Sequence, residues 1–391
     1  MADLLRPTRN TLLSALRTIL DLLVHMPGHP KPLWPGARYT DHDRDMAVER
    51  GLQFIGHVAA NPQHFHEWGF DLLWCFFTIS NTARNVHLRE MARGIGQERA
   101  RQWRQEHVEP PADDPDELTG FVFGVDAAER LLSVHDKALQ HRIQNAAAHY
   151  SAVDFLEFDP KLEPPPADIP EFCPGCDLRS PRGATTCQKC ATPLTFRSPY
   201  NVWQEALVIT YTGQIYGVHL GASYRDVLQW ISSMRPYPER TRLKLNEAEF
   251  DDVTYAITHL IYTLNDYGKY RLSPAWLPQE LAYLRTNLME AQEFRDSEIL
   301  GEFLDTLRAF GADEGDAMVR SGTDYLLSRQ NPDGSWGDLG DSDIYNRYHS
   351  TWTAVDGLRE YSFHQERLLL PELMPLLQRP NIGRTKENPT A

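Results

Sequence analysis

The sequence predicts an all-α protein with a small four-cysteine zinc knuckle inserted between two helical segments. Along most of the 391 residues, apolar side chains recur at spacings of three and four, with few β-branched alternations. A proline-rich segment interrupts this pattern near the middle of the chain, and two Cys-x-x-Cys pairs follow it. With 41% hydrophobic residues, the chain has enough apolar mass for a substantial core.

The first helical segment, 1–162, carries five stretches with helical periodicity, at 10–24, 46–59, 67–80, 86–106 and 127–150. The second, 199–378, carries eight, at 206–217, 223–234, 247–267, 278–293, 297–310, 317–329, 350–361 and 371–378. Prolines remove amide donors and disfavour helix, so 163–198 is predicted to be a linker followed by the cysteine insertion. The tail, 379–391, is rich in Pro, Asn, Arg and Lys and is expected to be flexible.

Composition excludes several classes of protein. A formal net charge of −15 argues against a nucleic-acid-binding surface, because such surfaces cluster Lys and Arg on one face. No apolar run approaches the ~20 residues that a membrane span requires, and the N-terminal residues lack a secretory signal pattern. We therefore expect a cytoplasmic protein. The unpaired Cys75 lies in an apolar run and is predicted to be a buried, inert thiol.

The two Cys-x-x-Cys pairs predict a metal site. Cys173 and Cys176 form the first pair, and Cys187 and Cys190 the second. Two tight turns at this spacing present four thiolates, which is the tetrahedral ligand set of structural zinc. Because all four ligands are sulfur, no coordination position is left open for water, so we expect a structural role. The insertion either pins the two helical segments together or offers a docking surface to a protein partner.

A segment near the C-terminus resembles a known repeat. It comprises Gln330, the turn Asp333-Gly334, Trp336-Gly337, and, after a loop, the stretch 348–354. This pattern resembles the glutamine–tryptophan repeat of the terpenoid cyclases and protein prenyltransferases, which are α/α toroids, that is, barrels of helical hairpins. The resemblance implies that an outer helix ends near Gln330 and that an inner helix starts near Ser350.

A narrower resemblance concerns the stretch from Tyr348 to Trp352. It is similar to the segment that supplies the histidine ligand of the catalytic zinc in protein prenyltransferase β-subunits, so His349 inherits that role by analogy. The Asp and Cys that complete the family's ligand set are absent here, as are the acidic motifs of the terpenoid cyclases. The resemblance therefore bears more on fold than on chemistry.

Superposing the predicted helix ends near 264–268, 307–311 and 358–362 gives a register of 40 to 50 residues, which suits one hairpin per repeat. This register places Tyr255, Glu298 and His349 in one layer. A second list follows from the same register and from helical spacing: His259, Glu302 and Thr353 share the next layer, Asp252 shares a face with Tyr255 and His259, and Asp305 shares one with both glutamates.

The candidate catalytic residues are therefore His259, His349, Glu298, Glu302 and Asp252. His259, His349 and Glu302 could hold a second metal ion, zinc, iron or manganese, at the mouth of the toroid. The alternative is that the glutamates are solvated surface charges and the histidines hydrogen-bonded core residues.

Three functions follow from these observations. The leading hypothesis is a metal-dependent or acid/base enzyme that acts on a hydrophobic, natural-product-like small molecule in a cavity lined by aromatic residues, of which the chain has many (9 Trp, 16 Tyr and 16 Phe). The second is a non-catalytic binding or scaffold protein with a structural zinc. The third, from the resemblance, is an isoprenoid cyclase or prenyltransferase.

Overall fold

The computed structural model describes residues 36, 38–238, 247–294, 296–341 and 343–379, and in these residues it is helical, with four isolated β-bridges and no strand. The first helices are α2 (Asp41–Ala60), α3 (Pro62–Thr82), α4 (Val86–Glu106), α5 (Pro115–Leu132), α6 (Lys137–Ala147), α7 (Ala152–Leu156) and α8 (Pro199–Tyr216). They are followed by α9 (Tyr224–Leu228), α10 (Ile231–Met234), α12 (Glu247–Asn265), α13 (Pro278–Phe294), α14 (Ser297–Ala309), α15 (Ala317–Ser328), α16 (Ile344–Leu358), the 3₁₀ turn η1 (Pro371–Leu373) and α17 (Met374–Leu377). The all-α prediction is confirmed.

Most predicted helices are present, and side-chain caps explain where they begin. The Asn85 side chain accepts hydrogen bonds from the first amides of α4, which spans the predicted residues 86–106. The long predicted helix at 127–150 is wrong. α5 ends where Ser133 takes a left-handed conformation (φ 54°), and the side chain of Asp136 then caps a separate helix, α6. The predicted helix at 10–24 and all but the first residue of the tail, Arg379, lie outside the described residues.

The helix that carries His349 begins earlier than predicted. α16 starts at Ile344, and not near Ser350, because the side chain of Asp343 accepts a hydrogen bond from the Tyr345 amide (2.9 Å). His349 therefore lies inside the helix, where its position is fixed by the surrounding backbone. No helix of the described residues is both long enough and apolar enough to cross a membrane.

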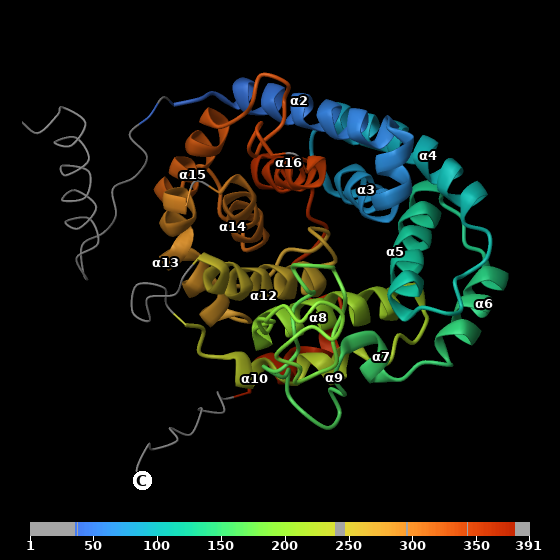
Figure 1. Cartoon of the computed structure of the whole chain (residues 1–391). Coiled ribbons are helices and arrows are strands. Elements are labelled where there is room, and N and C mark those ends of the chain that lie inside the picture. The colour runs from blue at the N-terminus through green and yellow to red at the C-terminus, as the bar shows by residue number, and fades with distance from the viewer. Residues whose placement is uncertain (1–35, 37, 239–246, 295, 342, 380–391) are drawn as a thin grey trace, which may run out of the picture.

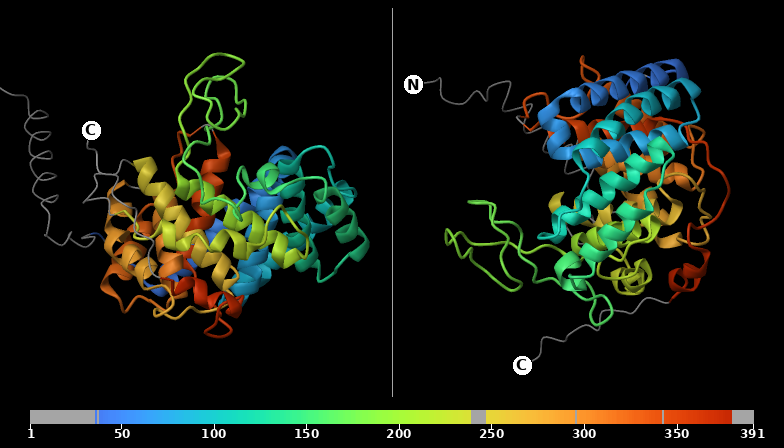
Figure 2. Two further views of the ribbon diagram at one scale, coloured as in Figure 1. Left: turned by 90° about the horizontal axis from the view of Figure 1, so that it is seen from below. Right: turned by 90° about the vertical axis from the view of Figure 1, so that its right-hand side faces the viewer.

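The helices are arranged around a central region (Figure 1). α3, α5, α8, α12, α14 and α16 lie toward the middle of this view, and α2, α4, α6, α13 and α15 lie at its periphery. Apolar residues of both helical segments belong to one continuous buried cluster. The segment that carries the four cysteines projects from the helical body (Figure 2).

The loop between α15 and α16 shows how the glutamine–tryptophan pattern is used. The Trp336 side chain is fully buried, and its indole N–H donates to the Leu326 carbonyl in α15 (2.8 Å). The Gln330 amide nitrogen donates to the carbonyls of Ala47 in α2 (2.7 Å) and Gly334 (2.9 Å). This loop therefore fastens the end of α15 to α2, near the start of the described chain.

The helices α14 and α16 approach each other closely because two glycines face the contact. A Cβ added at Gly301 would lie 2.5 Å from the backbone of Thr353, and one added at Gly357 would lie 2.6 Å from the Gly301 carbonyl oxygen. Side chains larger than hydrogen cannot fit at either position without separating the helices. This contact sets the distance between the functional side chains that the two helices carry.

We expect Gly301→Ala to reduce the free energy of unfolding by about 1–3 kcal/mol, because the methyl group overpacks the contact between α14 and α16. Gly94→Ala in α4 is the matched control, since nothing lies within 4 Å of the added Cβ. That change should stabilise the protein by up to about 1 kcal/mol through helix propensity. Urea unfolding of both variants measures the difference, and equal effects would contradict the close contact.

Candidate functional site

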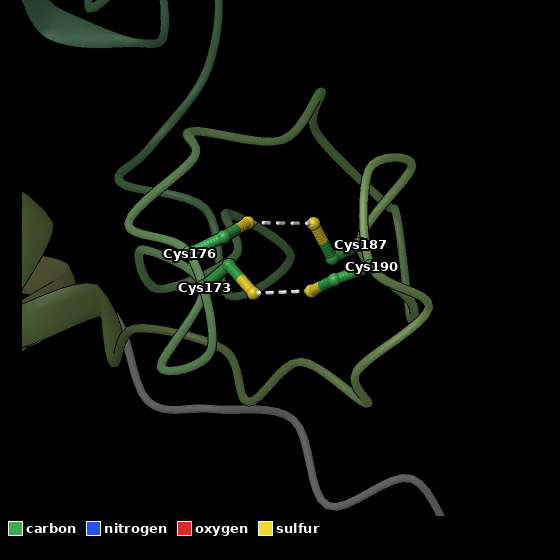
Figure 3. A group of neighbouring side chains, drawn as sticks. All are labelled: Cys173, Cys176, Cys187 and Cys190. Carbon is green, nitrogen blue, oxygen red and sulfur yellow. Dashed lines mark hydrogen bonds between the residues drawn. The ribbon is translucent and has the colours of Figure 1, made fainter.

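The four knuckle cysteines converge in space, as predicted (Figure 3). The Sγ atoms of Cys173 and Cys190 lie 3.3 Å apart, and those of Cys176 and Cys187 lie 3.6 Å apart. All four sulfurs lie within 4.8 Å of one another. Four cysteine sulfurs at these separations form a ligand set for a tetrahedral metal ion.

The two cysteine pairs sit on turns of the same geometry. The amide of Asp177 donates to the Cys173 carbonyl (2.8 Å), and the amide of Ala191 donates to the Cys187 carbonyl (2.9 Å). Both donor residues have a positive φ, of 55° and 57°. Gly175 is also required, because a Cβ there would lie 2.9 Å from Thr192 Oγ1 and 3.4 Å from the Cys190 sulfur. The backbone of the two turns thus brings the four sulfurs into a compact group.

We expect purified protein to contain one metal ion per chain, and Cys176→Ser to lose it. Cys75→Ser is the control, because that cysteine is fully buried in the helical core, as the sequence predicts. Elemental mass spectrometry of the three proteins gives both the stoichiometry and the element. Retention of the ion in Cys176→Ser would contradict a four-sulfur site.

A cavity lies at the centre of the helical body and contains about 950 Å³ of space free of protein atoms, part of it open to solvent. It is lined by residues of six described helices, α3, α5, α8, α12, α14 and α16, together with residues that follow α12 and α16. Both helical segments of the chain therefore contribute to one wall. Its lining includes His259, Glu302 and His349 from the sequence-based list of candidates.

One layer of candidate residues is in direct contact, as the repeat register predicts. His349 Nδ1 lies 3.0 Å from Glu298 Oε1, and the hydroxyl of Tyr255 donates a hydrogen bond to the same oxygen. Ser350 Oγ donates to the other carboxylate oxygen (3.4 Å). Three helices, α12, α14 and α16, thus meet at the Glu298 carboxylate.

The next layer, one turn further along the helices, holds Glu302, His259 and Thr353, which all line the cavity. The hydroxyl of Thr258 donates to Glu302 Oε2, and His259 Nδ1 lies 4.0 Å from that oxygen. His259 Nδ1 also lies 3.0 Å from the Tyr255 carbonyl. Because a carbonyl only accepts, Nδ1 carries the proton and Nε2 carries the lone pair.

The glutamates of the two layers differ in their pKa and therefore in their charge. Burial would raise the pKa of Glu298, but the charge and hydrogen bond of His349 and the Tyr255 hydroxyl outweigh it and hold this pKa at about 2. Burial raises the pKa of Glu302 to about 8, against the hydrogen bond from Thr258. At neutral pH, Glu298 is ionised and Glu302 keeps its proton.

The histidines are also split. Burial would lower the pKa of His349, but the charge and hydrogen bond of Glu298 raise it to about 9. Burial lowers the pKa of His259 to about 4, so this ring is neutral. The cavity wall therefore presents one imidazolium, one neutral imidazole and one protonated carboxyl, which is an arrangement capable of proton transfer.

Three carboxyls that are not among the candidate catalytic residues also line the cavity: Asp71, Asp305 and Asp356. Burial raises the pKa of Asp305 to about 7 and raises the pKa of Asp71 and of Asp356. The sequence already places Asp305 on one helix face with Glu298 and Glu302, and the helical spacing from His349 to Asp356 could have identified Asp356. Asp71 lies in an apolar stretch of the distant helix α3, and the sequence carries no signal that assigns it to this site.

The structure separates two of the predicted groupings. Asp252 does not line the cavity. Its carboxyl is hydrogen-bonded to Ser198 and Asn201 and lies near the charge of Arg197. Burial raises the pKa of Asp252. The expected second metal triad, His259, His349 and Glu302, does not bring its ligand atoms together. Among the described residues, only the four cysteines form a group of three or more potential ligands within 4.8 Å.

Comparison of the chain with family models, with curated proteins and with the structures already solved finds no match in any of the three. The resemblance to the terpenoid cyclases and protein prenyltransferases therefore rests on the sequence pattern alone.

We expect Glu302→Gln to remove a pH dependence of stability between about pH 4.5 and 8, the ordinary and the raised pKa of this group. In this window the folded protein keeps the proton and the unfolded chain does not, so the contribution of Glu302 to stability falls as pH rises, by about 1.4 kcal/mol per pH unit. Below the window the contribution is fully present, and above it the contribution is lost.

Urea unfolding of wild type and Glu302→Gln across this pH range measures the effect as the difference between the two free energies. Glu106→Gln, on the exposed end of α4, serves as the control. A constant difference between wild type and Glu302→Gln would mean that Glu302 titrates normally.

Proposed function

We propose that the protein is an acid/base enzyme that acts on a hydrophobic small molecule in the central cavity. The observation that carries this proposal is the position of the Glu302 carboxyl, which is buried in the cavity wall with the Thr258 hydroxyl donating to it and His259 Nδ1 4.0 Å away. Burial in this place raises the pKa of Glu302 to about 8. A general acid works best when its pKa lies near the working pH, and burial places Glu302 there.

The surroundings of Glu302 suit proton donation. After its proton leaves, the carboxylate is stabilised by the Thr258 hydroxyl and by the nearby positive charge of His349. Glu298 keeps His349 charged and fixes its ring through the 3.0 Å contact at Nδ1. His259, neutral and with its lone pair on Nε2, is an acceptor for a proton in the same layer. Glu302 and His259 thus supply an acid and a base at one level of the cavity.

The lining favours a substrate with a large apolar surface. The aromatic residues of the wall are Phe70, Trp74, Phe123, Tyr262, Tyr267, Trp352 and Tyr361. Such rings contribute apolar contact area and exclude water from the reacting groups. An α/α toroid, as the sequence resemblance implies, is consistent with six helices around this cavity. Isoprenoid cyclisation or prenyl transfer stays an alternative within this substrate class.

We also propose that the metal at the four cysteines is zinc and that its role is structural. The support is the all-sulfur ligand set, which leaves no position open for substrate. Metal binding at such a site contributes to the free energy of folding and takes no part in a catalysed reaction. A protein partner at the knuckle and a cytoplasmic location stay predictions from the sequence.

The proposed function is tested by deuterium incorporation. Wild-type protein is incubated in D₂O with a library of hydrophobic small molecules, and each compound is examined by mass spectrometry. We expect a compound to gain deuterium at carbon or to be converted to a deuterated product. Glu302→Gln should slow this reaction by about 10²–10⁴-fold, the range of general acid–base catalysis.

Glu106→Gln controls for the substitution itself and should react like wild type. If no compound gains deuterium or is converted, the binding or scaffold hypothesis takes the place of the enzyme. If Glu302→Gln reacts as fast as wild type, Glu302 is not the acid.

A further inference from the structure

Carboxyl groups outnumber basic groups on the cavity wall. Asp71, Glu302, Asp305 and Asp356 line it, against His349 and Arg359, with His259 neutral. Across the residues that the structure describes, the salt bridges of Lys and Arg include none with Asp71, Glu302 or Asp305 within 4.0 Å. Their known polar partners are hydroxyl groups. Tyr345 donates to Asp71 (3.2 Å), and Thr258 donates to Glu302.

Both basic groups of the wall are already engaged. Arg359 Nε lies 2.6 Å from Asp356 Oδ1, and its guanidinium stacks 3.8 Å from the centre of the Tyr361 ring. His349 pairs with Glu298, which lies behind the wall. Each base is therefore ion-paired with one carboxylate, and Asp71, Glu302 and Asp305 have no ion pair with Lys or Arg, although the charges of His349 and Arg359 act on them from a distance. The wall therefore carries more carboxyl groups than basic groups, and a positively charged ligand would stabilise the ionised form of the carboxyls that lie next to it.

The aromatic wall points to the same kind of ligand. Aromatic faces attract cations through the ring quadrupole, and cages of such rings recognise ammonium groups. Trp74 and Tyr267 meet edge to face at 5.2 Å between ring centres, and Tyr262 stacks on Tyr267 at 5.7 Å. These three rings lie on the wall together with the carboxyls of Asp71 and Asp305.

We propose that the cavity binds a hydrophobic molecule that carries a cationic nitrogen, with the charge held between the carboxyls of Asp71 and Asp305 and the aromatic rings. The inference rests on the proposed function, since it names the class of substrate on which Glu302 and His259 would act. The carboxyls supply the charge and the rings supply the apolar contact. A neutral hydrocarbon would leave the carboxyls with hydroxyl partners only and would gain nothing from their charge.

The test compares two probes of the same shape, benzyltrimethylammonium and its uncharged isostere neopentylbenzene, on the full chain with its metal bound. Calorimetric titration at pH 7.5 should show the ammonium binding at least tenfold more tightly than the hydrocarbon. Repeating the titration in buffers of different ionisation enthalpy should show proton release, because the cation favours the ionised carboxyls.

Asp71→Asn and Asp305→Asn should each weaken ammonium binding about tenfold and leave hydrocarbon binding unchanged. Asp113→Asn, on the exposed loop before α5, is the matched control and should change neither. Tyr262→Leu keeps all the formal charges and removes one of the three rings, so it should weaken ammonium binding more than hydrocarbon binding. This variant keeps the inference testable if a carboxamide variant fails to fold. Thermal melting followed by circular dichroism identifies any variant that is unfolded.

The inference is overturned if the two probes bind with equal affinity or if neither binds. It is also overturned if ammonium binding is insensitive to both carboxamides and to Tyr262→Leu. The proposed function fails separately, through the deuterium experiment. Deuterium incorporation without a preference for the ammonium probe would contradict the cationic ligand and leave the proposed enzyme function standing. Ammonium preference without deuterium incorporation would leave a cation-binding protein that is not an enzyme.

Discussion

The close contact between α14 and α16 determines the geometry of the candidate site. Gly301 and Gly357 let the two backbones approach, and this brings Glu298 of α14 within 3.0 Å of His349 of α16. The same helices carry Glu302, Asp305 and Asp356 to the cavity. If the helices were a few tenths of an ångström further apart, the ion pair would weaken first, because charge-assisted hydrogen bonds depend steeply on distance. The packing of Gly301 and Gly357 thus controls the ionisation of Glu298 and His349.

Desolvation then makes two similar glutamates different. Glu298 and Glu302 lie one turn apart on α14, and both are largely buried. Glu298 has a charged partner and loses its proton readily, whereas Glu302 has hydroxyl and neutral imidazole neighbours and keeps its proton. The free energy that burial withholds from a charge is recovered only where an opposite charge is in contact. One helix therefore presents a permanent anion and a titratable acid side by side.

Local sequence patterns predicted what depends on local structure. The cysteine spacing predicted the sulfur site. The helical periodicity and the repeat register placed Glu298 with His349 and Glu302 with His259, because helix geometry relates residues three, four and seven apart. The break between α5 and α6 was missed, since it depends on a left-handed Ser133 that composition does not reveal. Asp71 was missed because its role depends on α3 meeting α16, some 270 residues later in the chain, as its hydrogen bond from Tyr345 shows. Asp252 was misplaced because a shared helix face is wide enough to reach either the cavity or a neighbouring helix end.

The Gln330 side chain has a consequence for how the chain is synthesised. Its amide joins the α15–α16 loop to the Ala47 carbonyl, across 283 residues of sequence. Helices α2 and α3 therefore leave the ribosome long before the loop between α15 and α16 has been synthesised. Until then, their apolar inner faces lack this contact. Contacts of such high sequence separation slow folding and prolong the exposure of apolar surface. Until the part of the chain that carries Gln330 has been synthesised, the apolar faces of α2 and α3 stay incompletely covered, which is the kind of surface that chaperones bind.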